Sequence, residues 1–593
     1  MNPVGPANAP DPRNRWAAWI ALFFCVWAVV SRVWVTEDAY ITFRAIENLF
    51  AGHGLVFNPG DRVEVFTHPL WMLLLVSIRA IGLPLHIGSI VLGLSFSLGT
   101  LAFLVFRRTP AGNRALPVAA LALVSISGFR DFATAGMEYS LVFFLLTLLV
   151  FALRTEKLRD RPFFYSGLLA ALYLTRPELA LLAVYYSAFF AFELLELDGR
   201  ELFYKRDLSA LAGRVLRKGL PWLVGFVLVA GSYHLFRAFY YGDIFPNTYY
   251  AKAGLSSYFS QGWKYLALTL LWSPALWLLA IWFFITMAWR RLRAVAAPRL
   301  HFETLRELGA AVLVTVYVVR VGGDFMAFRF LLAPIMLAVL ALQRLMDAFP
   351  MGQGRPWLRL ALPALALVLS FFPVPPSSGV IADERQQFVE GETLVTLWTS
   401  SEHRWGRTGH RFGEFARCLG VEEMHITNSI TQARCMQGIG LGYFGVNAGP
   451  QVWILDEQGL PNRDVATSPV LFRWRPGHEH YIDLNHVVRS RSWFCSSGEP
   501  AFDRVMATPI GILISLDPAV LSTVPDVRSR LAALVRLKNA GSVIVPMLET
   551  EYGVRVEELE RQAVTWQADP LLTFQHRCWR NSWPPDRERP YPF

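Results

Sequence analysis

Residues 85–106 read LHIGSIVLGLSFSLGTLAFLVF, an apolar run that contains no Asp, Glu, Lys or Arg. As a helix, this run is long enough to cross the hydrocarbon core of a bilayer, which is about 30 Å thick. Comparable runs recur from Trp16 to Phe372, and none of that kind follows. The sequence therefore predicts a polytopic helical membrane domain over residues 16–372. A tail of residues 1–15 precedes it, and a water-soluble domain of residues 373–593 follows.

The overall composition points the same way. Of the 593 residues, 54% are hydrophobic and only 17% are charged, whereas soluble proteins carry about 25% charged residues. The net charge of +10 does not indicate a nucleic-acid partner, because much of the Arg and Lys lies in short links between apolar runs. The Pro-rich residues 1–15 precede no cleavage site, so the first run is expected to remain as a span.

The positions of the positive charges orient the spans. Links rich in Arg and Lys occupy residues 107–114, 154–161, 200–218, 290–299 and 344–359. Placing these links in the cytoplasm puts the N-terminus inside and the C-terminal domain outside. The eleven expected spans are residues 16–34, 85–106, 115–128, 139–153, 163–174, 178–197, 219–239, 266–289, 306–321, 330–346 and 358–372.

The apolar segment from Pro69 to Gly82 is the one ambiguous run. It has about 14 residues, which is short for a span, although two of the expected spans are no longer. Counting it as a span would place Arg107 and Arg108 outside and reverse every later link. We therefore expect an in-plane or re-entrant helix at the outer surface.

Five polar clusters fall at the outer ends of the expected spans. They are residues 36–44, 130–138, 175–178, 246–252 and 322–329. Ionisable groups at a membrane boundary are costly unless they are paired or functional, so their convergence on one face indicates a site. Simpler interpretations stay open. Thr36 with its two following acids is also typical of a helix cap, and Arg176 with Glu178 is also typical of a structural ion pair at a helix start.

The residue types in these clusters suit transfer of a sugar from a phosphate. Such chemistry needs a carboxylate near the reacting hydroxyl or anomeric carbon, and cations that hold the phosphate. Neither glycine-rich nucleotide-binding motif is present, so a lipid-borne donor fits better. The candidate carboxylates are Glu37, Asp38, Asp131, Glu138 and Asp324, and the candidate cations are Arg44, Arg130, Arg176, Lys252 and Arg329.

Several of these blocks together resemble a known family. The segment from Thr36-Glu37-Asp38 through residues 57–64 to Thr67-His68-Pro69 is similar to the terminal arabinofuranosyltransferases of actinobacterial cell-wall arabinan. Later blocks follow in the same order and extend the resemblance over nearly the whole chain. These blocks are residues 130–134, 176–178, 240–242 with 251–252, 322–326, 383–385 and 456–460.

The resemblance implies a C-type glycosyltransferase fold and a decaprenyl-phospho-arabinose donor in a bacterial inner membrane. It also implies that Glu37 and Asp38 are the catalytic acidic pair. The family usually has two aspartates, so Asp38 is the stronger candidate for the essential carboxylate. Residues Ala327-Phe328 replace a His-Gly pair that is common in the family, so the wall of the site is expected to differ there.

The expected site combines three sets of residues and no cofactor, although a divalent cation stays open. The catalytic residues are Asp38 and Glu37. The donor phosphate is expected to meet Arg176, Lys252, Arg329 and Arg44, and other substrate contacts are expected from Asp131, Glu138, Glu178, His68, Asn247 and Asp324. The expected partners are a polyprenyl-phosphate sugar, a glycan or glycoprotein acceptor and membrane lipids. Rival interpretations are transfer of another prenyl-linked sugar such as mannose, a lipid-glycan transporter and a non-catalytic binding module.

The C-terminal domain is expected to be α/β or α+β, to lie in the periplasm and to help hold the acceptor. Short strands are predicted at residues 452–455 and 511–514, and a helix at residues 527–537. Four of the five cysteines, Cys418, Cys435, Cys495 and Cys578, lie in this domain. An even number of cysteines outside the cytoplasm predicts disulfides, with three possible pairings.

Overall fold

A computed structural model describes two compact units of the chain. The described residues are 12–108, 117–152, 161–194, 215–252, 257–273, 298–347, 380–388, 403–419, 423–428, 440–470 and 475–480, with a few residues between these ranges. Unit 1 comprises Met1–Thr36, Thr67–Ala238 and Leu255–Val395, and unit 2 comprises Glu37–Phe66, Phe239–Gly254 and Thr396–Phe593. Two loops from the membrane half of the sequence thus belong to the same compact unit as elements of the tail, while the expected domain bounds stay a prediction.

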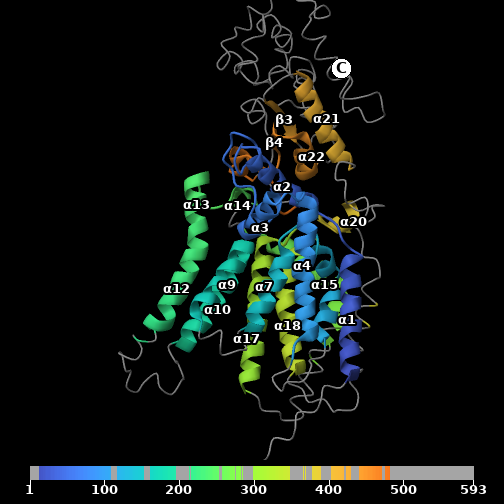
Figure 1. Cartoon of the computed structure of the whole chain (residues 1–593), viewed down its shortest axis with the longest axis vertical. Coiled ribbons are helices and arrows are strands. Elements are labelled where there is room, and N and C mark those ends of the chain that lie inside the picture. Colours follow the sequence, from blue (N-terminus) through green and yellow to red (C-terminus); the bar gives the residue numbers. More distant parts are fainter. Residues whose placement is uncertain are drawn as a thin grey trace, which may run out of the picture. The chain divides into compact units, whose positions relative to one another are not determined.

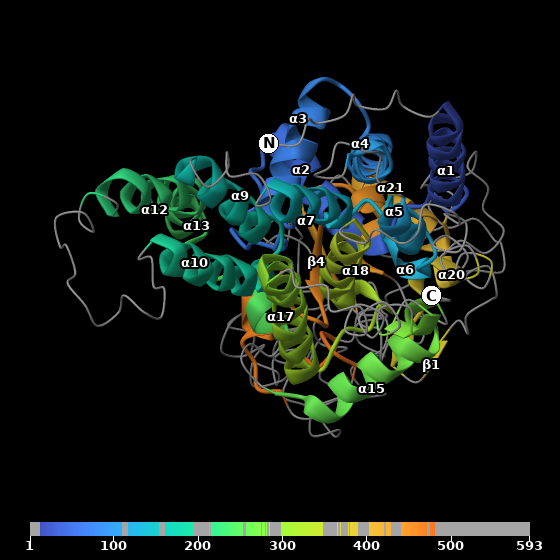
Figure 2. The same cartoon turned by 90° about the horizontal axis from the view of Figure 1, so that it is seen from below.

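Unit 1 is mostly helical, and its long helices run side by side (Figure 1). The helices are α1 (Pro12–Val30), α3 (Pro69–Ala80), α4 (Leu85–Phe106), α5 (Val118–Val124), α6 (Ser127–Phe132), α7 (Tyr139–Ala152), α9 (Pro162–Thr175), α10 (Ala180–Leu194), α12 (Leu220–Phe226), α13 (Ser232–Tyr241, whose last residues belong to unit 2), α15 (Phe259–Leu271), α17 (Pro298–Val321), α18 (Leu332–Asp347) and α20 (Glu384–Phe388). In the end-on view of Figure 2, α7, α17 and α18 lie together, while α9, α10 and α12 extend to one side. The short strands β1 (Ser377–Ser378) and β2 (Ile381–Ala382) pair antiparallel.

Small residues allow these helices to pack closely. A Cβ atom added at Gly93 of α4 would lie 2.8 Å from the carbonyl oxygen of Ala133 and 3.1 Å from the Cα atom of Thr134. The Ser97 hydroxyl, one turn further along α4, donates a 3.1 Å hydrogen bond to the same Ala133 carbonyl. Glycine and serine therefore bring α4 against the segment that enters α7, as small residues do between membrane helices.

Among the described residues, two helices are long and apolar enough to cross a membrane. They are Leu85–Phe106, and the continuous helix Val215–Tyr241, which includes two π-helical turns. Shorter apolar helices cover Ala18–Val30, Pro69–Ala80, Tyr139–Phe151, Pro162–Thr175 and Pro177–Phe192. Unit 1 is thus consistent with a helical membrane protein, while the number of spans stays a prediction. The expected last span, 358–372, lies almost entirely outside the described residues.

The segment expected to form a span at residues 115–128 is broken. Helix α5 ends at Val124, Ile126 is extended, and α6 begins at Ser127. A Cβ atom at Gly128 would lie 2.4 Å from the Cβ atom of Phe328, so the glycine allows α6 to approach this neighbour closely. The Arg130 guanidinium donates a 3.1 Å hydrogen bond to the Val124 carbonyl oxygen. It thereby supplies a partner for a carbonyl group that loses its helical hydrogen bond at the break.

Ion pairs tie helix ends together away from the substrate candidates. At the end of α4, Arg107 makes a bidentate pair with Asp347, the last residue of α18. One turn earlier in α18, Arg344 pairs with Glu307 of α17 at 2.9 Å. The ends of α4 and α18 therefore meet, while the side of the membrane on which they lie stays a prediction.

Unit 2 joins helix α2 (Glu37–Phe50) to elements from the tail. The tail elements are α21 (Arg404–Leu419), β3 (Met424–Asn428), α22 (Leu441–Ala448), β4 (Val452–Asp456) and α23 (Arg463–Ala466); α14 (Asn247–Ala251) comes from the loop after α13. Strands β3 and β4 pair in parallel, with α22 between them in the chain. The predicted strand at residues 452–455 is present as β4. The predicted strand 511–514, the helix 527–537 and the proposed disulfides lie outside the described residues.

Candidate active site

The acidic pair opens helix α2 in unit 2. Glu37 is 7% exposed, and its Oε1 accepts hydrogen bonds from the backbone N–H groups of Gly442 and, at 3.2 Å, of Tyr443. These N–H groups lie in the first turn of α22, where an anion is favoured by the helix dipole. Asp38, the next residue, is partly exposed. The two acids therefore differ: the Glu37 carboxylate binds the start of α22, whereas Asp38 reaches solvent.

Glycines in the tail allow this close approach. A Cβ atom at Gly442 would lie only 2.1 Å from the Glu37 carbonyl oxygen. A Cβ atom at Gly440 would lie 2.6 Å from the Glu37 carboxyl carbon. Helix α22 therefore packs against the beginning of α2 at backbone distance, and side chains at these two positions would separate them.

Arg44 lies two turns further along α2 and is buried. Its guanidinium donates to three backbone carbonyl oxygens, those of Phe57 at 2.8 Å, Gly445, and Val452 at 2.6 Å. It also lies over the Phe57 ring, 4.5 Å from the centroid. These contacts join α2 to α22 and β4. Arg44 thus holds unit 2 together, and its expected contact with a phosphate stays a prediction.

The other two candidates in unit 2 lie at α14. The Asn247 side chain donates to the carbonyl oxygens of Gly459 at 2.7 Å and Leu460 at 2.9 Å. Lys252 caps the C-terminal end of α14 and is exposed. The adjoining loop begins at Asp456, whose pKa burial raises to about 7. Asn247 therefore fixes the loop that carries this carboxyl group, and Lys252 is an exposed cation.

The charged candidates in unit 1 form a buried network. Glu138, just before α7, is 1% exposed, and its Oε1 accepts a 2.5 Å hydrogen bond from Arg176. Its Oε2 lies 3.3 Å from Nδ1 of His68. The Nε of Arg176 also donates to Glu178. The structure thus brings together the segments at 68, 130–138 and 175–178, which are far apart in sequence.

A second ion pair adjoins this network. Arg329 makes a bidentate pair with Asp324 in the turn before α18. The ring of Phe330 lies between the two cations, with its centroid 5.0 Å from the Arg176 guanidinium and 5.4 Å from that of Arg329. Arg176 also lies 4.6 Å from the Tyr139 ring, and that buried hydroxyl has no hydrogen-bond partner among the described residues.

Both arginines in this network already have carboxylate partners. Two arginines, Arg176 and Arg329, face the carboxylates of Glu138, Glu178 and Asp324. An incoming phosphate would have to compete with these carboxylates for the guanidinium groups. The structural ion pair between Arg176 and Glu178, one of the two interpretations of their sequence, is present. Arg176 has a further carboxylate partner in Glu138. A role of either arginine toward a phosphate stays a prediction.

Asp131 lies in another pair in unit 1. It pairs with Arg32, and its carbonyl oxygen accepts a 2.6 Å hydrogen bond from the Trp34 indole. Arg385 lies 3.9 Å away, and burial together with Asp131 raises the pKa of Asp383 to about 6. The sequence identified the segments at 130 and 383 separately and did not place them side by side.

Among the described residues, no group of three His, Cys, Asp or Glu side chains could hold a metal ion.

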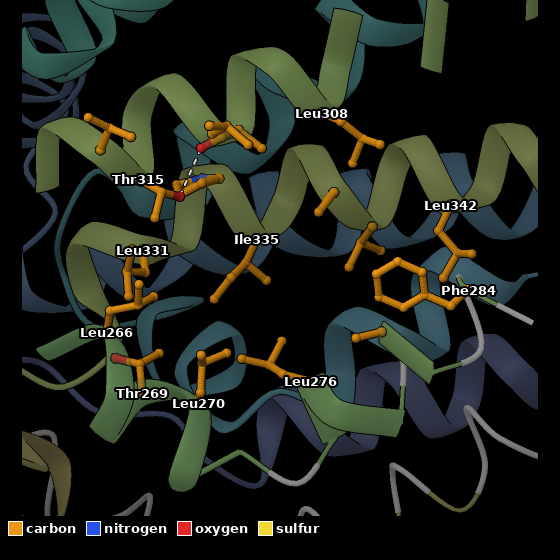
Figure 3. Close-up of a pocket in the computed structure, with 17 residues that line it drawn as sticks. Leu266, Thr269, Leu270, Leu276, Phe284, Leu308, Thr315, Leu331, Ile335 and Leu342 are labelled. Atoms are coloured by element: carbon orange, nitrogen blue, oxygen red, sulfur yellow. Dashed lines mark hydrogen bonds between the residues drawn. The ribbon is translucent and has the colours of Figure 1, made fainter. Parts of the chain in front are cut away.

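Unit 1 also contains an apolar cavity of about 410 Å³, shown in Figure 3. Helices α15, α17 and α18 form most of its wall, with Leu308 and Ile335 on facing helices and Phe284 at one end. Thr269 and Thr315 are the polar side chains in the wall, and their hydroxyl groups donate to carbonyl oxygens four residues earlier in their own helices. The cavity therefore presents hydrocarbon, and the sequence pattern did not locate it.

Comparison with known proteins identifies relatives of this chain. It is 32% identical to a terminal β-(1→2)-arabinofuranosyltransferase of Mycobacterium tuberculosis over 546 residues, which covers 79% of this chain and 84% of that protein. It is 30% identical to a protein of the same name from Corynebacterium glutamicum over 366 residues, 55% of this chain and 50% of that protein. No family model and no solved structure matches. With this identity over most of both sequences, the chain belongs to the terminal β-(1→2)-arabinofuranosyltransferase family.

Proposed function

We propose that the protein is a C-type glycosyltransferase with eleven membrane spans, whose site and C-terminal domain face the periplasm. It transfers arabinofuranose from decaprenyl-phosphate to the end of a glycan or glycoprotein acceptor in a β-(1→2) linkage. The family makes the chain a glycosyltransferase. The observation that carries the proposal is the asymmetry of the acidic pair, in which Glu37 binds backbone N–H groups and Asp38 reaches solvent.

In the proposed reaction, Asp38 takes the proton of the acceptor hydroxyl. That oxygen then bonds to the anomeric carbon of arabinofuranose, and the bond from this carbon to the phosphate oxygen breaks. Decaprenyl phosphate leaves with the bonding electrons. A cation near the phosphate lowers the barrier, because negative charge grows there in the transition state. Lys252 suits this role, since it is an exposed cation at the C-terminal end of α14.

The apolar cavity supports a lipid-linked donor. Its wall includes Leu266 and Leu331, which directly follow Tyr265 and Phe330 in the sequence. The Tyr265 hydroxyl accepts a 3.2 Å hydrogen bond from the Phe330 N–H group. The cavity thus adjoins the charged network of unit 1, and its hydrocarbon wall suits an isoprenoid chain.

Activity of full-length protein in lipid nanodiscs tests the carboxylate assignment. The substrates are decaprenyl-phospho-arabinose and an arabinofuranose-terminated oligosaccharide, with the product measured by mass spectrometry. Asp38→Asn is expected to lower kcat by about 10²- to 10⁴-fold, because it removes the base. Glu37→Gln keeps an acceptor oxygen and is expected to be milder. Asp464→Asn in the first turn of α23 is the matched control, since Asp464 is exposed.

The outcomes separate the rival functions. Retention of most activity by Asp38→Asn would show that the base lies elsewhere. Transfer from a mannosyl donor in place of the arabinosyl donor would correct the sugar. Absence of transfer from either donor, with lipid-glycan movement across the membrane, would identify a transporter.

A filled cavity tests the lipid site. Ile335→Trp is expected to raise the donor KM and to leave the acceptor KM unchanged, because the larger ring occupies space for the isoprenoid chain. Val184→Trp on α10 is the matched control, since Val184 is 70% exposed. An unchanged donor KM in a stably folded Ile335→Trp variant would remove this support for a lipid donor.

A further inference from the structure

Unit 2 holds a row of aromatic rings that the proposed reaction does not use. The aromatic row consists of Tyr40, Tyr443, His403 and Trp405. The Tyr40 and Tyr443 ring centroids lie 4.6 Å apart, the His403 ring stacks on Tyr443 at 4.8 Å, and Trp405 meets His403 edge-on at 5.0 Å. The tyrosines are buried, whereas His403 and Trp405 are partly exposed. The row therefore runs from the core of unit 2 to its surface.

The exposed end of the row lies beside the acidic pair. A Cβ atom at Gly440 would lie 2.5 Å from Cζ3 of Trp405 and 2.6 Å from the carboxyl carbon of Glu37. The Trp405 ring and the Glu37 carboxyl group thus flank the same glycine, and their two atoms lie within about 5 Å of each other by this geometry. Asp38 is the next residue after Glu37. An aromatic surface therefore adjoins the proposed base within a single unit.

Trp405 and His403 precede the glycine-lined contact between α21 and α22. Helix α21 packs on α22 through Phe412, whose ring lies 5.6 Å from that of Phe444. Gly409 and Gly413 also bring the two helices together, since Cβ atoms there would lie 2.2 and 2.6 Å from carbonyl oxygens of α22. Trp405 lies in the first turn of α21, before these contacts, and retains exposed surface.

His403 adds a polar group with a defined direction. Its Nδ1 accepts a hydrogen bond from the backbone N–H group of Trp405 at 3.3 Å. The neutral ring therefore carries its proton on Nε2, which is a hydrogen-bond donor. A sugar ring presents C–H groups on its faces and hydroxyl groups at its edges. The aromatic surface suits the C–H faces of such a ring, and the adjacent donor and nearby carboxylate suit its hydroxyl groups.

We propose that Trp405 and His403 bind the terminal sugar of the acceptor glycan and place its hydroxyl group at Asp38. This inference rests on the proposed function and assigns the acceptor side of the same site. Glu37 is a positioning residue here: its bonds to the first turn of α22 hold Tyr443, and through it His403, beside α2. The ligand class is a furanose-terminated oligosaccharide.

The test measures acceptor and donor KM values separately on full-length protein. Trp405→Ala is expected to raise the acceptor KM about tenfold and leave the donor KM unchanged, because only the acceptor loses an aromatic partner. Trp405→Phe is expected to recover most of the loss. The matched control is His425→Ala, which removes another histidine stacked on a tryptophan, Trp453, at 4.7 Å; the acceptor KM is expected to stay unchanged.

A binding measurement separates this inference from the proposed function. Asp38→Asn is titrated with the oligosaccharide alone, and tryptophan fluorescence reports binding without turnover. Weaker binding when Trp405→Ala is added supports the subsite even if the donor sugar proves different. An unchanged acceptor KM and unchanged binding in Trp405→Ala, with or without a lowered Tm, would show that the ring has only a structural role. Loss of donor and acceptor affinity together would also overturn the assignment.

Discussion

Replacing Arg176 with alanine removes the cation from the middle of the buried network of unit 1. Its side chain is 7% exposed, and it pairs with Glu138, which is 1% exposed, and with Glu178. The substitution leaves two carboxylates facing each other without a cation between them. Breaking a buried pair in this way costs about 3–5 kcal/mol. The lost stacking on Tyr139 and Phe330 adds about 1 kcal/mol.

The expected result is a fall in Tm on the order of 10 °C, measured by thermal unfolding in nanodiscs. Arg176→Lys is expected to recover part of it, because an ammonium group cannot bridge two carboxylates as a guanidinium does. Adding Glu138→Gln to Arg176→Ala is expected to restore stability in part, since it removes one of the unpaired charges. Arg463→Ala is the control, because that arginine is 51% exposed beside Asp243 and its pair is worth about 1 kcal/mol or less.

Binding of a donor analogue to the same variants completes the test. If the network is structural, the folded Arg176→Ala protein binds the analogue with normal affinity. A Tm equal to that of the unsubstituted protein, together with weakened analogue binding, would refute the reasoning. It would show that Arg176 leaves its carboxylates to bind the phosphate.

Three further predictions concern unit 2 and the topology. Gly442→Ala is expected to lower Tm and activity together, at a cost of about 1–3 kcal/mol, because its Cβ atom would meet the Glu37 carbonyl oxygen at 2.1 Å; normal activity would show that α22 need not approach α2 so closely. Burial raises the pKa of Asp456 from 3.8 to about 7, so the stability that this carboxyl contributes is present below about pH 4 and is lost as pH rises through about 7. Asp456→Asn is therefore expected to raise Tm at pH 8 but not at pH 4, and equal Tm values at pH 8 would contradict this. A cysteine at Thr109 is expected to react with membrane-impermeant reagents only from the cytoplasm, and one at Ser257 only from outside; labelling of Thr109 from outside would make Pro69–Gly82 a span.

The helices of unit 1 were predictable where the apolar pattern is long and uninterrupted. The run 85–106 is helix α4 with the same bounds, and Pro69–Gly82 contains helix α3. The break between α5 and α6 was not predictable. It lies beside a contact of Gly128 with Phe328, two hundred positions away in the sequence, which no local pattern contains. The charge pattern likewise gave no sign that α17 begins at Pro298 rather than near residue 306.

The candidate site was predictable as a set of residue types and only partly as contacts. The position of Arg176 and Glu178 at a helix start suggested that they could pair, and they do. The third partner, Glu138, comes from another helix and required the fold. The Glu37 carboxylate accepts hydrogen bonds from the first turn of α22. That contact could not be foreseen, because the sequence does not show which tail segment returns to α2.

The bonds between α2 and α22 also set an order of events during synthesis. Glu37 and Gly442 are separated by 405 positions in the chain. At about 5–20 residues per second, the ribosome needs on the order of 20–80 s to make the second partner after the first. Over that interval the growing chain already contains Asp38 but lacks the helix that borders it. The acidic pair therefore acquires its surroundings only near the end of translation, so a chain that stops before residue 441 would carry the helices of unit 1 and never assemble the acidic pair with α22.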